Sequence, residues 1–180
     1  MESHRMTQGQ TGMTAVIIRD DNLGTVLSRL RESNIDVAAI NSPLQITISG
    51  LKSTIEAIGK DLVQTGCAKA CIPLKQVSEP FHSRYMANAG HYFSLHLSNF
   101  QLNPFDNVVL SNVTGKPFVI DNVNSLLTRQ LSSPVQWLDS IRYCQQFDNV
   151  DFVEVGPRSV LSSLLKKDYQ IANSSCLDNY

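Results

Sequence analysis

The residue best suited to chemistry in this chain of 180 residues is His82. It lies in the stretch EPFHSRYM, after a proline and an aromatic residue and before a hydroxyl and a base. An imidazole in such a setting commonly takes a proton from a partner and returns it, so the pattern raises the question of which group His82 serves. On spacing alone, a core histidine satisfied by hydrogen bonds is the simpler interpretation.

The other reactive side chains give no second site by themselves. Ser83 is adjacent in sequence to the candidate base, which is a poor position for its nucleophile, so we expect a helix N-cap. Cys67 and Cys71 lack the second pair that a zinc site needs, so reduced structural thiols and no bound metal are expected. His91 and His96 lie five residues apart, a spacing that does not place two imidazoles on one helical face.

Composition restricts the partners. Charged residues make up 17% of the chain and the formal net charge is -1, so no basic surface marks nucleic acid or an anionic membrane as a partner. No apolar run is long enough to span a bilayer, and the start, MESHRMTQGQ, lacks an apolar signal region. We therefore predict a cytoplasmic protein.

Residues 12–74 show a regular change of hydrophobic period. The apolar residues predict, in order, a strand, a helix, two strands joined through NSP, a second helix and a closing strand. The second helix has Ile55, Ile58 and Leu62 on its apolar stripe and ends at Gly66. The order β-α-β-β-α-β is that of the ferredoxin-like split βαβ arrangement.

The residues after Pro80 predict a different layout. We expect helices over 83–100, 122–131 and 134–147 and over SVLSSLLKK, a buried strand in NVVLSNV before the turn TGKP, a strand in DFVEVG, and a frayed tail in NSSCLDNY. Two strands do not make a stable parallel sheet. The rest of that sheet is therefore expected from sequence before Met1 or from another polypeptide.

Five motifs in order carry a resemblance to a known family. The chain resembles the malonyl-CoA:acyl-carrier-protein transacylases, and most of all the trans-acting acyltransferases of polyketide synthases, over about residues 6–167. The motifs are AAINSPLQITISG, PFHSRYM, LSNVTGKPF, RQLSSPVQW and FVEVGPRSVLSSL.

The resemblance implies an α/β (α+β) fold: a ferredoxin-like subdomain plus the C-terminal part of an α/β-hydrolase-like acyltransferase domain, with an incomplete sheet. It divides the chain into a remnant of the helix and loop after the nucleophile elbow, the small subdomain, part of the large subdomain, and a tail. These are residues 1–11, 12–74, 75–168 and 169–180.

In this family a serine in a G-H-S-x-G elbow takes malonyl from coenzyme A and passes it to the phosphopantetheine thiol of an acyl carrier protein, with no permanently bound cofactor. The resemblance makes His82 the general base and gives the backbone carbonyl of Gln130 the role of orienting it. It places Phe81, Asn41, Gln45 and Asn112 near substrate, and Phe81 favours malonyl over branched acyl groups.

The chain departs from the family at its nucleophile. No glycine in the sequence has a serine two positions later, so the elbow is absent, and so is the N-terminal G-Q-G stretch that supports the oxyanion hole. The family's malonyl-binding arginine aligns near Glu2, which has the opposite charge, and Arg5 is out of register. Met1 therefore looks like a start within a longer family sequence.

Three functions remain open. The first is a malonyl-CoA:acyl-carrier-protein acyltransferase whose serine comes from residues outside this chain, so that the isolated chain is inactive. The second is a non-catalytic module that docks a carrier protein or acts as a scaffold. The third is hydrolysis of acyl groups from carrier proteins. The partners expected are an acyl carrier protein and a polypeptide that carries the missing N-terminal half.

Overall fold

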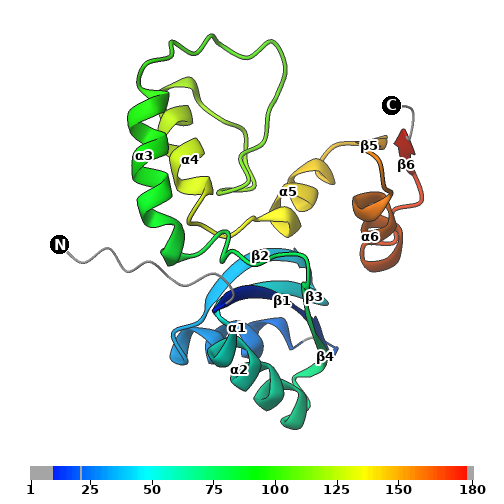
Figure 1. Ribbon diagram of the computed structural model, residues 1–180. Helices are drawn as coiled ribbons and strands as arrows, with labels where there is room; N and C mark the ends of the chain where they lie inside the picture. The colour runs from blue at the N-terminus through cyan, green and yellow to red at the C-terminus, as the bar shows by residue number, and fades with distance from the viewer. Residues whose placement is uncertain (1–9, 21, 178–180) are drawn as a thin grey trace, which may run out of the picture. The chain divides into compact units, whose positions relative to one another are not determined.

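The computed structural model describes residues 10–20 and 22–177 and divides the chain into two compact units, 1–140 and 141–180 (Figure 1). Glu2 and Arg5, like the rest of residues 1–9, lie outside the described residues. No helix within the described ranges has both the length and the apolar character needed to cross a bilayer.

The first unit opens with a four-stranded antiparallel sheet of strand order β2-β3-β1-β4. The chain runs through β1 (Thr11–Ile18), α1 (Leu23–Glu32), β2 (Asp36–Ser42), β3 (Gln45–Leu51), α2 (Lys52–Gln64) and β4 (Ala68–Pro73). These are the six elements, in the order, that the hydrophobic period predicts. Figure 1 shows α1 and α2 on the same side of the sheet.

The two faces of this sheet have different chemistry. Ile46 and Ile48 of β3 are fully buried in the apolar core with the stripes of the two helices. Thr47 and Ser49 alternate with them and so point to the opposite face, where they are buried as well. The helix-covered face is therefore an apolar core, and the other face buries small hydroxyl side chains. The core residues are Val16, Ile18, Val26, Leu30, Ile35, Ile46, Ile48, Ile55, Leu62, Cys67 and Ala68.

The remainder of the first unit combines helices with a long irregular segment over residues 98–119. It contains η1 (Arg84–Met86), α3 (Ala87–Leu97), η2 (Ile120–Asn122), α4 (Val123–Gln130) and the start of α5 (Trp137–Cys144). In Figure 1 α3 and α4 lie side by side, and a Cβ at Gly90 of α3 would lie 3.5 Å from the carbonyl oxygen of Thr128 in α4. Helix α5 begins later than expected, because Pro134 precedes a residue that pairs with β2.

The prediction of a buried strand in NVVLSNV is wrong. The described structure has only an isolated bridge between Leu110 and Pro117 there, and Val108 is 74% exposed. Instead, the backbone N–H of Ser111 donates to the carbonyl oxygen of Lys116 at 2.8 Å. The carbonyl oxygen of Ser111 accepts the N–H of Gly115 at 2.8 Å, and the two hydrogen bonds close a turn. A buried strand needs a paired neighbour on the sheet, and the described chain provides none for this run.

The second unit is a β-α-β arrangement of β5 (Phe152–Val155), α6 (Val160–Asp168) and β6 (Ser174–Leu177). The two strands are parallel, with Val153 opposite Ser175 and Val155 opposite Leu177. The expectation of a frayed tail over NSSCLDNY is therefore wrong for residues 174–177. These residues gain backbone hydrogen bonds from β5, which no local sequence pattern reveals.

The side chain of Glu154 links β5 to the N-terminus of α6 through hydrogen bonds. Its Oε1 accepts the backbone N–H of Leu161 at 3.0 Å, and its Oε2 accepts the N–H and hydroxyl of Ser162 at 2.8 and 2.9 Å. These are two of the N–H groups that a helix leaves unpaired at its start. The hydrogen bonds from Ser162, followed by that from Leu161, hold the pKa of Glu154 below its ordinary value of 4.5.

The second unit should therefore lose stability in acid. A carboxylate whose folded pKa is depressed contributes stability above its unfolded pKa and loses it as the pH falls through the folded value. We expect hydrogen exchange of the α6 amides to accelerate relative to the intrinsic rate as the pH falls below about 4.5. Glu154→Gln should accelerate it several-fold at neutral pH and flatten the pH dependence. Glu56→Gln on α2 is the control, and equal behaviour of the two variants would contradict the assignment.

Candidate active site around His82

His82 occupies an unusual backbone position between β4 and η1. Its φ of 56° lies in the left-handed region, which side-chain-bearing residues rarely adopt. A residue persists there only when its surroundings hold it, and such residues gather at functional sites. The ring is half-buried, so part of it faces solvent.

The end of α4 holds His82. Backbone N–H of His82 donates to the carbonyl oxygen of Leu131 at 3.1 Å, and its ring Nδ1 lies 2.8 Å from the carbonyl oxygen of Gln130. Gln130 is the last residue of α4, so both acceptors are among the carbonyls that a helix leaves unpaired at its C-terminus.

This geometry fixes which ring nitrogen carries the proton. A carbonyl oxygen only accepts hydrogen bonds, so Nδ1 donates and the neutral ring keeps Nε2 as a proton acceptor. Among the described residues, the imidazole has no other hydrogen-bond partner. The ring therefore leaves Nε2 able to accept a proton.

Ser83 lies at the helix N-cap position that the sequence predicts, but it does not cap the helix. It occupies the N-cap position of η1, but its side chain makes no capping hydrogen bond. Instead the hydroxyl, in a side chain that is 1% exposed, donates to the carbonyl oxygen of Pro80 at 2.5 Å. The expectation of an N-cap hydrogen bond is wrong, because the turn at His82 folds the hydroxyl back onto its own chain.

The segment 130–136 links three parts of the first unit. It begins with the two carbonyls that hold His82. Val135 then forms a parallel bridge with Ala39 of β2, donating to the carbonyl oxygen of Ala38 at 2.9 Å and accepting from Ile40 at 2.9 Å. Gln136 N–H donates to the carbonyl oxygen of Asn112 at 2.7 Å. The segment thus ties the histidine turn, β2 and the 111–117 turn together.

The predicted substrate residues lie on several elements of the first unit. Asn112 is attached to the segment 130–136 through its backbone. Asn41 lies on β2, with its Nδ2 3.4 Å from Oγ1 of Thr47, and Gln45 opens β3. Phe81 adjoins His82 and is 44% exposed. The structure brings Gln130 into contact with His82, and the substrate roles of the other four residues remain predictions.

Sequence reasoning missed Arg84, Asp36 and Asn34. Arg84 lies two residues after His82 and binds Asp36 and Asn34 through a network of hydrogen bonds. The partners are separated from it by 48 and 50 residues, so no local spacing could reveal the contact.

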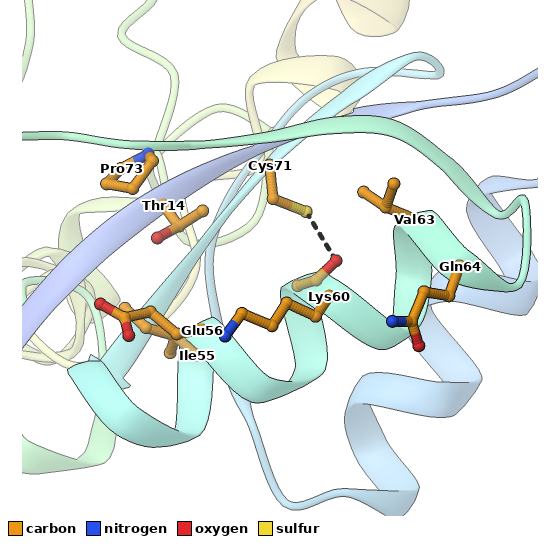
Figure 2. Close-up of a pocket in the computed structure, with 9 residues that line it drawn as sticks. Thr14, Ile55, Glu56, Lys60, Val63, Gln64, Cys71 and Pro73 are labelled. Atoms are coloured by element: carbon orange, nitrogen blue, oxygen red, sulfur yellow. Dashed lines mark hydrogen bonds between the residues drawn. The ribbon is translucent and has the colours of Figure 1, made fainter.

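A cavity of about 430 Å³ lies elsewhere, between α2 and the strands β1 and β4. Figure 2 shows Cys71 in its wall, with the thiol directed at the carbonyl oxygen of Gly59, 3.5 Å away. Burial raises the pKa of the Cys71 thiol above 9.0, so the thiol stays protonated at neutral pH. None of the residues that line this cavity is a predicted site residue.

No family model matches the chain. It is 35% identical over 161 residues to the polyketide biosynthesis malonyl CoA-acyl carrier protein transacylase PksC of Bacillus subtilis, covering 87% of this chain and 56% of PksC. It is 30% identical over 181 residues to the malonyl CoA-acyl carrier protein transacylase of Synechocystis, covering 98% of this chain and 60% of that protein. The polyketide biosynthesis protein PksE of Bacillus subtilis is 38% identical over 164 residues, 91% of this chain and 21% of PksE.

Solved structures agree. The malonyl CoA-acyl carrier protein transacylase of Clostridium perfringens superimposes with a TM-score of 0.86 at 28% identity, over 98% of this chain and 56% of that one. The corresponding protein of Streptococcus pneumoniae gives a TM-score of 0.83 at 28% identity, over 96% of this chain and 56% of that one.

The described chain has a mixed α/β fold that matches these transacylase structures. More particularly, the chain is a homologue, over most of its length, of the malonyl-CoA:acyl-carrier-protein transacylases of fatty acid and polyketide biosynthesis. This confirms the family predicted from the motifs. The chain spans about half the length of the transacylases it matches, 56% of PksC and 60% of the Synechocystis protein.

Proposed function

We propose that the chain is the histidine-bearing part of a malonyl-CoA:acyl-carrier-protein acyltransferase. The observation that carries this proposal is the imidazole of His82, with Nδ1 on the carbonyl of Gln130 and Nε2 left to accept a proton. Homologues named for the same activity cover most of the chain. The proposal gives residues 12–74 the role of the ferredoxin-like small subdomain and residues 75–168 that of part of the large, hydrolase-like subdomain.

The proposed reaction has two steps. Nε2 of His82 takes the proton of a serine hydroxyl as the oxygen attacks the thioester carbonyl of malonyl-CoA, and the imidazolium returns that proton to the departing coenzyme A thiolate. The phosphopantetheine thiol of a carrier protein then attacks the malonyl-serine ester, and His82 moves the proton from thiol to serine. The Gln130 carbonyl and the α4 C-terminus stabilise the intermediate imidazolium.

The proposal places the substrate against Phe81, Asn41, Gln45 and Asn112. The exposed ring of Phe81 beside the base would hinder an α-branched acyl group. A steric filter of this kind discriminates by about 1–3 kcal/mol, which corresponds to a malonyl preference and not to absolute selectivity.

The serine belongs, in this proposal, to sequence outside the chain, and an exposed apolar face of the second unit supports a place where that sequence could pack. Val153, Val155 and Leu177 share one face of the β5–β6 pair and are 53%, 70% and 52% exposed. The alternating residue Glu154 contacts α6, so the helix covers the other face. Parallel strands are ordinarily covered on both faces, and two strands alone are marginal. We propose that this exposed apolar face, called the bare face, packs against the part of the transacylase fold that this chain does not contain.

The test is reconstitution. The chain is mixed, or coexpressed, with the separately made part of PksC that lies outside its match to this chain, where the proposal places the serine, and the pair is called the reconstituted enzyme. We expect label from malonyl-CoA to appear on the serine of the PksC part and then on an added carrier protein only when both parts are present. Label on the chain alone would show that the nucleophile is misplaced, and carrier binding without any transfer would favour a docking module. Free malonate in place of the loaded carrier would favour a hydrolase.

The isolated chain should self-associate through the bare face. Exposed apolar side chains on a parallel pair are a surface that other molecules cover. We expect sedimentation velocity to show a concentration-dependent rise in mean mass, and Val155→Lys to reduce it strongly. Lys166→Ala on α6 serves as the control on the helix of this unit. A strictly monomeric chain at all concentrations would contradict the prediction.

A further inference from the structure

The turn that carries His82 is fastened to the sheet by Arg84. Nε of this side chain donates to both carboxylate oxygens of Asp36, at 2.9 Å each, and Nη2 donates to Oδ1 at 2.7 Å. Nη1 donates to Oδ1 of Asn34 at 2.6 Å, and Nη2 to its carbonyl oxygen at 3.2 Å. All three side-chain nitrogens of Arg84 thus donate hydrogen bonds to Asp36, the first residue of β2, or to Asn34, which lies just before it. This set of contacts is called the Arg84 clasp.

The clasp also organises the backbone of the turn. Oδ2 of Asp36 accepts the backbone N–H of Arg84, the first residue of η1, at 3.1 Å. Asp36 therefore supplies the capping contact that Ser83 does not make. Asp36 pairs with Ser49 across the strands, so the two residues share the face of the sheet away from the helices. The histidine turn is consequently anchored on that face.

The contacts of Arg84 are better suited to positioning the His82 turn than to stabilising the folded chain. The Arg84 and Asp36 side chains are 46% and 17% exposed, and ion pairs this exposed contribute little to the free energy of unfolding. A planar guanidinium on a carboxylate is nevertheless strongly directional. His82 is held on its other side by the α4 carbonyls, in a disfavoured backbone conformation that its surroundings must maintain. The imidazole therefore lies between two anchors, and the clasp is one of them.

We propose that Arg84 is a positioning residue for His82: by tying the turn to β2, the clasp keeps Nδ1 on the Gln130 carbonyl and leaves Nε2 as the acceptor. The role of Nε2 as a proton acceptor in acyl transfer rests on the proposed function. The positioning of the ring by Arg84 does not rest on it, because the tautomer of the ring can be measured without any acyl transfer.

The test is long-range ¹H–¹⁵N NMR of the histidine side chains, at a pH where imidazole is neutral, with His82 assigned through His82→Gln. We expect a single tautomer, protonated at Nδ1, in the unmodified chain. Arg84→Ala should shift both ring nitrogens towards an averaged value and speed amide exchange at His82 about tenfold or more. Arg84→Lys should do the same, because lysine keeps the charge but lacks the planar fork.

The matched control is Arg29→Ala, which removes an arginine–carboxylate pair with Asp61, 3.0 Å long and also exposed. It should leave the His82 signals unchanged. Wild-type signals in Arg84→Ala, or the same shifts in Arg29→Ala, would overturn the proposal. Should Arg84→Ala not fold, Asp36→Asn weakens the clasp and gives the same readout. A clasp-dependent tautomer without transfer in the reconstituted enzyme would refute the proposed function while leaving this inference in place.

Discussion

Replacing His82 with glutamine in the reconstituted enzyme is expected to slow malonyl transfer by about 10²–10⁴-fold, the usual contribution of a general acid–base group. Glutamine can still donate to the Gln130 carbonyl, as Nδ1 does across 2.8 Å, but it cannot accept and return a proton. The loss should therefore fall on the rate of serine acylation, measured as label incorporated from malonyl-CoA in single-turnover mixing.

The control is His91→Gln, which changes an exposed histidine on α3. It should transfer at the unmodified rate, and both variants should keep the thermal midpoint of the unmodified chain. A His82→Gln variant that acylates the serine at the full rate would remove the imidazole from the mechanism. Loss of rate together with loss of folding would instead assign His82 a structural role.

Gly115→Ala is expected to destabilise the first unit by roughly 2–5 kcal/mol. The residue has φ of 65°, and an alanine there incurs about 1–2 kcal/mol of left-handed strain. Its Cβ would also lie 2.6 Å from Cβ of Asp139 and 3.0 Å from the backbone nitrogen of Ser140, so α5 would have to move, at about 1–3 kcal/mol for overpacking. Urea unfolding followed by the fluorescence of Trp137, the single tryptophan, measures the change.

Gly66→Ala separates the two contributions. Gly66 has φ of 75° and no atom within 4 Å of an added Cβ, so its variant carries the strain without the clash. It should lose about 1–2 kcal/mol. Equal losses at positions 66 and 115 would show that the contact with α5 contributes nothing, and would place the 111–117 turn away from that helix.

The elements of residues 12–74 were predictable because the information is local. Apolar and hydroxyl residues alternate along β3, and apolar residues recur at helical spacing along α1 and α2, so the pattern predicts which side of each of these elements faces the apolar core. The same holds for α6 and β5, which lie where the sequence places them. The motif around His82 likewise identified the family, because five short motifs in order carry more information than any one of them.

The remaining elements depend on whether a neighbouring strand is present to pair with them. NVVLSNV is as apolar as a buried strand, but the described part of the chain offers it no strand to pair with, and it forms a loop and a turn. Ser174–Leu177 forms a strand because it pairs with β5. Sequence alone thus determined the resemblance to the transacylases, most of the local elements and the motif that contains His82. The resemblance also pointed to the Gln130 carbonyl, which the structure places 2.8 Å from Nδ1 of His82. Only the tertiary structure decided which arginine holds the histidine turn, because Arg84 and Asp36 are 48 positions apart, where chain folding and not spacing sets the distance.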